Sequence, residues 1–223
     1  MGLAEFPGFD EAMRLRLAAA VDRLCEEFEG LYDRPAISAL VEASARELSA
    51  KGITPFVHIL AERFARERLR AQAQAEGRLE KPVPEVLFVS LTGGGRAEIG
   101  AALLARRAGD AVSIHSAGSQ AVAEIDENVY TAMKEVGIDL SDAFTKPLTE
   151  EVLAGADVVV TMGRSVGPVQ IPHVVRHVDW RVGDPAGAPL EEVRRVREDI
   201  ERRVETLALE LLQTGDRAAT VAP

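Results

Sequence analysis

The segment Leu79–Glu85 (LEKPVPE) contains two prolines and separates two stretches of different periodicity. After it, short β-branched runs alternate with helical stretches; the runs are VLFVS, AVSIHS, DVVVTM and HVVRHV. Apolar strands that alternate with helices are typical of a parallel sheet covered on both faces. We therefore expect an α/β domain over residues 83–214, with a four-stranded parallel sheet flanked by helices. Its helices are expected near 94–108, 125–136 and 148–154, with a long one through Gln213 and a loose end after it.

The stretch before this boundary has helical periodicity from residue 10 to about 79, with apolar residues at three- and four-residue steps. Asp10 is the expected N-cap of a first helix, and a second begins near Pro35 and stops at Gly52. A third helix is expected to have Pro55 at its first position and to close at Gly77. Residues 1–80 are therefore predicted to form a small all-α helical bundle.

The charge balance of the 223 residues constrains the partners. The formal net charge is −10, which argues against non-specific nucleic-acid binding. The chain has no apolar window long enough for a membrane helix, and its opening does not resemble a signal peptide, so we expect a cytoplasmic protein without a membrane partner. Cys25 is the single cysteine, which excludes an intrachain disulfide and a zinc site with several thiolates. We expect no metal and no cofactor.

The first strand runs into a glycine-rich turn, SLTGGGR, from Ser90 to Arg96. A strand, a glycine turn and a helix start direct several backbone N–H groups at one point, and the helix end adds partial positive charge there. Arg96 can donate two hydrogen bonds to a tetrahedral anion. The expected anion-binding residues are Leu91, Thr92, Gly93, Gly94, Gly95 and Arg96. The turn lacks the Gly-Lys of a nucleotide P-loop and the glycine spacing of a dinucleotide site.

With these motifs the sequence resembles the low-molecular-weight protein tyrosine phosphatases and their arsenate reductase relatives, which share a Cys-x5-Arg loop after the first strand. The resemblance covers residues 86 to about 212 and rests on an ordered set of motifs: SLTGGGR, SAGS, VGIDLSDAFTKPLTEEVLAGADVVVTMG and WRVGDPAG. Residues 10–79 are similar to the three-helix extension of some bacterial arsenate reductase-like proteins.

The resemblance implies roles for three residues. Ser90 stands at the nucleophilic cysteine, Arg96 at the anion-binding arginine, and Asp184 at the general acid that protonates the leaving group. Two further positions depart from the family: Ala97 replaces Ser or Thr, and Gly93 replaces Asn. A serine hydroxyl gains little from the loop that activates a thiolate, and it needs a neighbouring base.

Three hypotheses follow. In the first, the protein binds phosphate, arsenate or a phosphorylated side chain in the Ser-x5-Arg loop, with little or no cysteine-type catalysis, as a pseudoenzyme of a hydrolase family. In the second, it is an active tyrosine phosphatase or thiol-dependent arsenate reductase, because Ser90 replaces a natural cysteine or has an unseen base. In the third, it is a non-catalytic interaction module. The helical bundle is the expected surface for a homodimer or protein partner.

Overall fold

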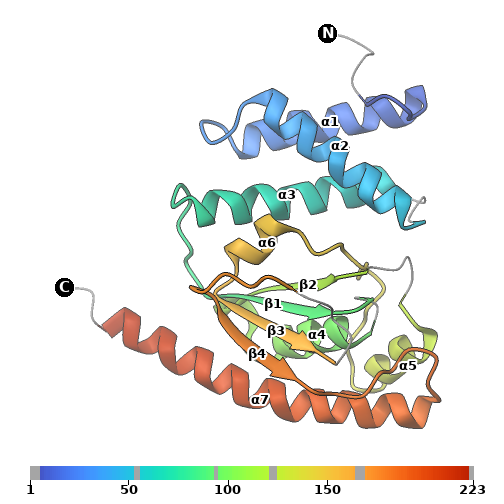
Figure 1. Ribbon diagram of the computed structural model, residues 1–223, viewed down its shortest axis with the longest axis vertical. Helices are drawn as coiled ribbons and strands as arrows, with labels where there is room; N and C mark the ends of the chain where they lie inside the picture. The colour runs from blue at the N-terminus through green and yellow to red at the C-terminus, as the bar shows by residue number, and fades with distance from the viewer. Residues whose placement is uncertain (1–5, 53–55, 93–94, 121–124, 164–168, 221–223) are drawn as a thin grey trace. The chain divides into compact units, whose positions relative to one another are not determined.

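The computed structural model describes residues 6–52, 56–92, 95–120, 125–163 and 169–220, with side chains described as far as Gln213 (Figure 1). The chain divides into two compact units, Met1–Glu80 and Lys81–Pro223. Within the described residues, no helix is both long and apolar enough to cross a membrane.

The first unit is a bundle of three helices: α1 (Glu11–Glu27), α2 (Arg34–Ala50) and α3 (Val57–Ala75). The predicted cap of α1 is confirmed, since the Asp10 carboxylate accepts a hydrogen bond from the backbone N–H of Met13 at 2.8 Å. Asp33 caps α2 in the same way through the N–H of Ala36. The apolar stripes of the helices meet in a buried core that includes Leu17, Leu24, Ile37, Val41, Leu48, Phe64 and Leu69.

The second unit has four parallel strands in the order β2-β1-β3-β4. They are β1 (Glu85–Ser90), β2 (Ser113–Gly118), β3 (Val158–Met162) and β4 (Arg176–Trp180). The predicted four-stranded parallel sheet with flanking helices is confirmed. Since the chain crosses from β1 to β2 on one side and reaches β3 on the other, the carboxyl end of β1 lies at the point where a crevice opens in such sheets.

The sheet has two differently covered faces (Figure 1). On one face lie α4 (Arg96–Ala108), α5 (Glu127–Glu135) and α7 (Leu190–Thr220), and on the other lies the short α6 (Glu150–Gly155). A 3-10 turn, Gly109–Ala111, leads from α4 toward β2. Alternate residues of β1 point to opposite faces, so Val86 and Phe88 join the main apolar core. Ser90, two residues further, points to that same face.

Three boundaries differ from the expectation. The third helix has Phe56 as its N-cap, at φ 60, and the predicted Pro55 start lies outside the described residues. β4 begins at Arg176 rather than His173, because Arg176 is the residue paired with Val158, and a turn over Pro172–Val175 precedes it. The helix α7 continues to Thr220, although residues after Gln213 were expected to be loose; Ala and Arg in that stretch favour a helix over the single Gly215.

Candidate functional site

Ser90 ends β1 and is almost completely buried, with 1% of its surface exposed. It pairs in register with Gly118 of β2. The backbone continues the pairing beyond the strand, since the Ser119 N–H donates to the Ser90 carbonyl at 3.0 Å and the Gln120 N–H donates to the Leu91 carbonyl at 2.7 Å. The start of the loop is therefore fixed from the β2 side.

The rest of the predicted anion loop leads from Ser90 to α4. Leu91 and Thr92 are half-buried, and Gly93 and Gly94 lie outside the described residues. Gly95 is the N-cap residue of α4, and a Cβ atom there would lie 2.9 Å from Cγ of Pro185. Because Gly95 has no side chain, it admits Pro185 and leaves the first N–H groups of α4 without a side-chain cap. That the amides of Leu91 to Gly95 bind an anion stays a prediction.

Arg96 begins α4, and its side chain is 6% exposed. Its Nη2 lies 3.2 Å from Oδ2 of Asp184, which is 57% exposed. The structure therefore brings together two of the three residues to which the resemblance assigns catalytic roles. These roles, including that of Ser90, stay predictions.

Gly163 packs directly against the Arg96 guanidinium. It follows β3 directly, has φ +91, and a Cβ atom there would lie 2.2 Å from Nη1 of Arg96. Its own N–H donates to the Trp180 carbonyl at 2.9 Å, which holds the segment in place. The TMG motif was part of the resemblance, but no role was predicted for this glycine. The signal that could have found it is a glycine directly after a buried parallel strand.

The loop that carries Asp184 is held by the start of α5. The Asp126 carboxylate accepts one hydrogen bond from the Asn128 N–H, which caps α5, and another from the Gly187 N–H, each at 2.9 Å. The Asn128 side chain donates to the Ala188 carbonyl at 2.9 Å. Sequence reasoning missed Asp126 and Asn128 as site residues. A helix cap is readable from sequence, but its second partner 61 residues away is not.

Two histidines of the sheet lie on the face opposite Ser90. His115 pairs in register with Leu87, and its Nε2 lies 2.8 Å from the Glu85 carboxylate. His177 pairs with Val159, and its Nε2 lies 2.8 Å from the Thr161 hydroxyl. Leu87, Val159 and their partners alternate with the residues that face the main core, so neither imidazole is placed to take a proton from Ser90.

The face of the sheet to which Ser90 points carries a buried carboxylate. Glu98, in the first turn of α4 and 6% exposed, accepts a hydrogen bond from the Ser116 hydroxyl at 2.6 Å. Sequence reasoning did not single out either residue. A negative charge in a first helical turn is favourable, and the hydroxyl offsets part of the cost of burying it.

Two aromatic side chains of the second unit lie in or against its apolar core. Trp180 is 6% exposed and packs against Phe88, with ring centroids 5.7 Å apart. Tyr130 is partly buried against the same core. Cys25 lies on α1 in the other unit and is half-buried. Among the described residues, no group of three or more His, Cys, Asp or Glu side chains could hold a metal ion.

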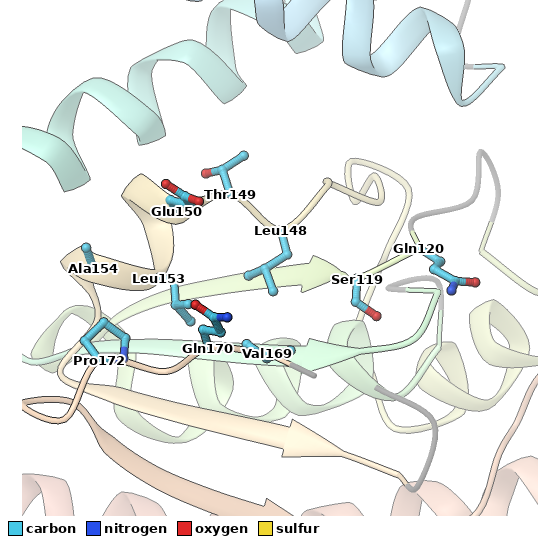
Figure 2. Close-up of a pocket in the computed structure, with 10 residues that line it drawn as sticks. All are labelled: Ser119, Gln120, Leu148, Thr149, Glu150, Leu153, Ala154, Val169, Gln170 and Pro172. Carbon is cyan, nitrogen blue, oxygen red and sulfur yellow. The ribbon is translucent and has the colours of Figure 1, made fainter. Parts of the chain in front are cut away.

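A pocket of about 800 Å³ lies on the α6 face of the sheet (Figure 2). Three segments of the second unit line it: the end of β2, the stretch through α6, and the stretch before β4. Its lining residues are Ser119, Gln120, Leu148, Thr149, Glu150, Leu153, Ala154, Val169, Gln170 and Pro172. Ser119 and Gln120 are the residues whose backbone is hydrogen-bonded to Ser90 and Leu91. Two lining residues are thus joined through their backbone to the start of the Ser90–Arg96 loop, while the pocket itself lies on the face opposite the Ser90 side chain.

Comparison with known proteins gives two family matches. The family described as low molecular weight phosphotyrosine protein phosphatase matches residues 85–217, more than half of the chain. The family described as protein-tyrosine-phosphatase-like, N-terminal domain matches residues 17–73. The predicted resemblance is therefore confirmed for both parts of the chain.

Individual relatives agree with these matches. A thioredoxin-dependent arsenate reductase of Corynebacterium glutamicum has a solved structure with a TM-score of 0.78 and 32% identity, covering 89% of this chain and 97% of that one. An arginine phosphatase of Geobacillus stearothermophilus has a TM-score of 0.51 and 26% identity, covering 59% and 94%. An arsenate reductase of Brevibacillus brevis is 39% identical over 111 residues, which are 48% of this chain and 78% of the relative. With its strand-loop-helix site, its parallel sheet and these matches, the chain belongs to the low molecular weight phosphotyrosine protein phosphatase family.

Proposed function

We propose that the protein binds a tetrahedral oxyanion in the Ser90–Arg96 loop and has little or no cysteine-type catalysis. The observation that supports this best is the buried guanidinium of Arg96, paired with the Asp184 carboxylate at 3.2 Å at the head of α4. A buried arginine needs an anionic partner. Here that partner is largely exposed, so phosphate, arsenate or a phosphorylated side chain can replace it at the guanidinium.

The serine argues against strong catalysis in the chain as written. A helix end and a ring of amides lower the pKa of a cysteine thiol enough to produce a thiolate, but a serine hydroxyl holds its proton far more tightly. The two sheet histidines face away from Ser90, which leaves them unsuited as its base. We therefore propose anion binding, and not catalytic turnover, as the function of this site. Asp184 can act as a general acid only in a chain that also has a nucleophile.

Titration of phosphate and of arsenate against thermal stability tests the binding proposal. A ligand that binds only the folded state stabilises it by about 2.7 kcal/mol at a concentration of 100 Kd. We expect a concentration-dependent rise in Tm that disappears in Arg96→Ala and persists in Arg107→Ala, an exposed arginine of the same helix. If neither anion raises Tm, the proposal is wrong, and the interaction-module hypothesis takes its place.

The second candidate is a thiol enzyme, a tyrosine phosphatase or arsenate reductase, in which Ser90 replaces a natural cysteine. The matches to arsenate reductases favour it, together with the Asp184 carboxylate beside Arg96. Under this candidate Ser90→Cys hydrolyses a generic aryl phosphate, and a second change, Arg96→Ala, removes the turnover. Turnover by the unchanged chain that is lost in Ser90→Ala would instead establish serine chemistry and overturn our first choice.

The helical unit remains the proposed surface for a homodimer or protein partner. Arginines on two helices of this unit form ion pairs within it: Arg66 of α3 pairs with Glu27 and Glu62, and Arg23 of α1 also pairs with Glu62. Among the described residues of this unit, Leu15, Phe56 and Ile59 are the large apolar side chains exposed for a partner. Sedimentation of the full chain over a range of concentrations tests self-association. A cytoplasmic location stays a prediction.

A further inference from the structure

We infer that Glu98 sets the charge of the anion that the Ser90–Arg96 loop binds, and that it favours the singly charged, protonated form of inorganic phosphate or arsenate over a dianion such as sulfate. The inference rests on the proposed function and adds the ligand class. It makes Glu98 a specificity-determining residue, a role that the family resemblance does not assign to it.

Glu98 lies in the first turn of α4, two residues after Arg96. The helix packs closely on β1 at Phe88, since a Cβ atom at Gly100 would lie 2.8 Å from Cδ1 of the Phe88 ring. Ser90 follows Phe88 on the same face of the sheet. The first turn of the helix, which precedes Gly100, therefore lies over the carboxyl end of β1.

The Ser116 hydroxyl fixes the direction of the Glu98 side chain, because it donates a hydrogen bond to Oε1 of Glu98 at 2.6 Å. Ser116 is paired in register with Phe88, and the next residue of β2 on that face, Gly118, is paired with Ser90. The spacing of strands and residues in a sheet puts the Cα atoms of Ser116 and Ser90 roughly 8 Å apart. The Glu98 carboxylate is therefore held beside Ser90, on the β2 side.

Arg96 extends to the other side of β1. Its guanidinium packs against Gly163, which follows β3, and lies 3.2 Å from the Asp184 carboxylate. Since the strand order is β2-β1-β3-β4, Ser90 at the end of β1 lies between the Glu98 carboxylate and the Arg96 guanidinium. An anion bound in the loop would therefore have a buried positive charge on one side and a buried negative charge on the other.

The charged side chains at this end of α4 include one positive and two negative ones, Arg96, Glu98 and Asp184. Arg106 and Arg107 belong to the last turn of the helix, about 15 Å away along its axis. Asp184 is 57% exposed and is screened by water, whereas Glu98 is 6% exposed. Because a buried charge is screened less than an exposed one, Glu98 contributes the larger part of the repulsion on a bound anion.

A carboxylate beside the ligand discriminates between anions by their charge. At a partly buried site, each additional negative charge on the ligand is expected to lower its affinity about tenfold. Dihydrogen phosphate and dihydrogen arsenate carry a single charge, and their O–H groups can donate a hydrogen bond to a carboxylate. Sulfate has the same tetrahedral shape, two charges and no proton. A phosphorylated side chain carries about −1.5 to −2 charges at pH 7, so it is expected to bind less tightly than the free monoanions.

Calorimetry on the unchanged full chain tests this selectivity without requiring turnover. Phosphate and sulfate would be titrated at the same ionic strength and at a mildly acidic pH below the second pKa of phosphate. Phosphate is then mainly a monoanion, and sulfate is a dianion. We expect phosphate to bind about tenfold more tightly than sulfate. Arsenate should match phosphate, because the two ions have the same charge and shape.

Glu98→Gln locates the effect. The carboxamide has the shape of the carboxylate, and its oxygen can still accept the hydrogen bond from the Ser116 hydroxyl, so the fold is expected to persist. The variant should bind both anions more tightly, with a gain about tenfold larger for sulfate, so that the preference for phosphate disappears. Glu201→Gln is the matched control, since it removes the same charge from a residue that pairs with Arg106 in the last turn of α4. This control should keep the preference.

The outcomes separate the two proposals. If phosphate does not bind to the unchanged chain, the proposed function fails. If phosphate binds but sulfate binds as tightly, the inference fails and the proposed function stands. The inference also fails if Glu98→Gln folds, as judged by circular dichroism, and keeps the full preference, or if Glu201→Gln removes it to the same extent. If Glu98→Gln does not fold, the comparison of the two anions on the unchanged chain still decides.

Discussion

Arg96 and Asp184, 88 residues apart in the chain, meet with Nη2 and Oδ2 separated by 3.2 Å. The guanidinium is buried and the carboxylate is mostly exposed, so the Asp184 carboxylate lies on the solvent side of the pair. Under the proposed function, an oxyanion at Arg96 competes with this carboxylate for the guanidinium. The proposal therefore predicts that anion binding is coupled to the position of the Asp184 loop.

Replacing Asp184 with Asn should strengthen phosphate binding. The change removes a negative charge that competes for Arg96 and retains a side chain of similar shape. Because Asp184 is largely exposed, the gain is modest, about 0.5–1 kcal/mol, or about two- to fivefold in Kd. Calorimetric titration measures it. Asp199→Asn, on α7 beside Arg202 and Arg203, is the control and should leave the Kd unchanged. Weaker binding in Asp184→Asn would contradict the competition.

Gly163→Ala should abolish anion binding, because its methyl group would occupy space now filled by Nη1 of Arg96, 2.2 Å from the Cβ position. The positive φ of 91° adds a backbone strain of about 1 kcal/mol or more. Gly137→Ala separates the two effects, since Gly137 has φ +76 and open space at its Cβ position. Both variants should lose stability in denaturant titration, but only Gly163→Ala should lose phosphate binding. Wild-type affinity in Gly163→Ala would contradict the role of Gly163.

The layout of the sheet was predictable because each strand carries its own signal. β1 is buried at all six positions, and its continuous apolar run in the sequence is what a strand covered on both faces requires. The N-cap at Asp10 was likewise local, since donor and acceptor lie three residues apart. The start of β4 was misplaced because Val174 belongs to the turn, where it is 94% exposed. Its β-branched side chain imitates a strand residue.

The parts of the site that could not be predicted depend on contacts between distant segments. Asp126 signals a helix start in any sequence, but its bond to the Gly187 N–H exists only because α5 packs beside the Asp184 loop. Ser90 and His115 point to opposite faces of the sheet because of the register between β1 and β2, and this register cannot be predicted from the sequence alone. Arg96 was predicted from the local pattern of strand, glycine turn and helix start, whereas Asp184 was found through the family resemblance, because no local pattern joins it to Arg96.

Asp126→Ala should loosen the Asp184 loop. The change removes the acceptor of the Gly187 N–H and also the cap of α5, so a stability loss of about 1 kcal/mol is expected from the cap alone. Asp33→Ala removes a similar cap from α2 and provides the control. Amide hydrogen exchange at Gly187 should accelerate in Asp126→Ala and stay unchanged in Asp33→Ala. Equal protection of Gly187 in both variants would show that Asp126 does not hold the loop.

His58 should make the protein less stable as the pH falls below 7. Burial lowers the pKa of His58, and the positive charge of Arg16 lowers it further. The unfolded chain, in which the imidazole has its ordinary pKa of about 6.5, therefore binds more protons than the folded one near and below that pH. The free energy of unfolding then declines as the pH falls through about 6.5 and levels off below the folded pKa. Urea unfolding of the full chain at several pH values measures this slope.

His58→Gln removes the titrating group and should make the decline between pH 7 and 5.5 shallower, while the slope above pH 7 stays as in the unchanged chain. The Glu62 carboxylate of the same unit titrates at lower pH. Its hydrogen bond from Arg23 lowers its pKa, so its stabilisation is lost only below about pH 4.5, outside the range in which the His58 slope is measured. An equally steep decline above pH 5.5 in the variant would assign the acid sensitivity to another group.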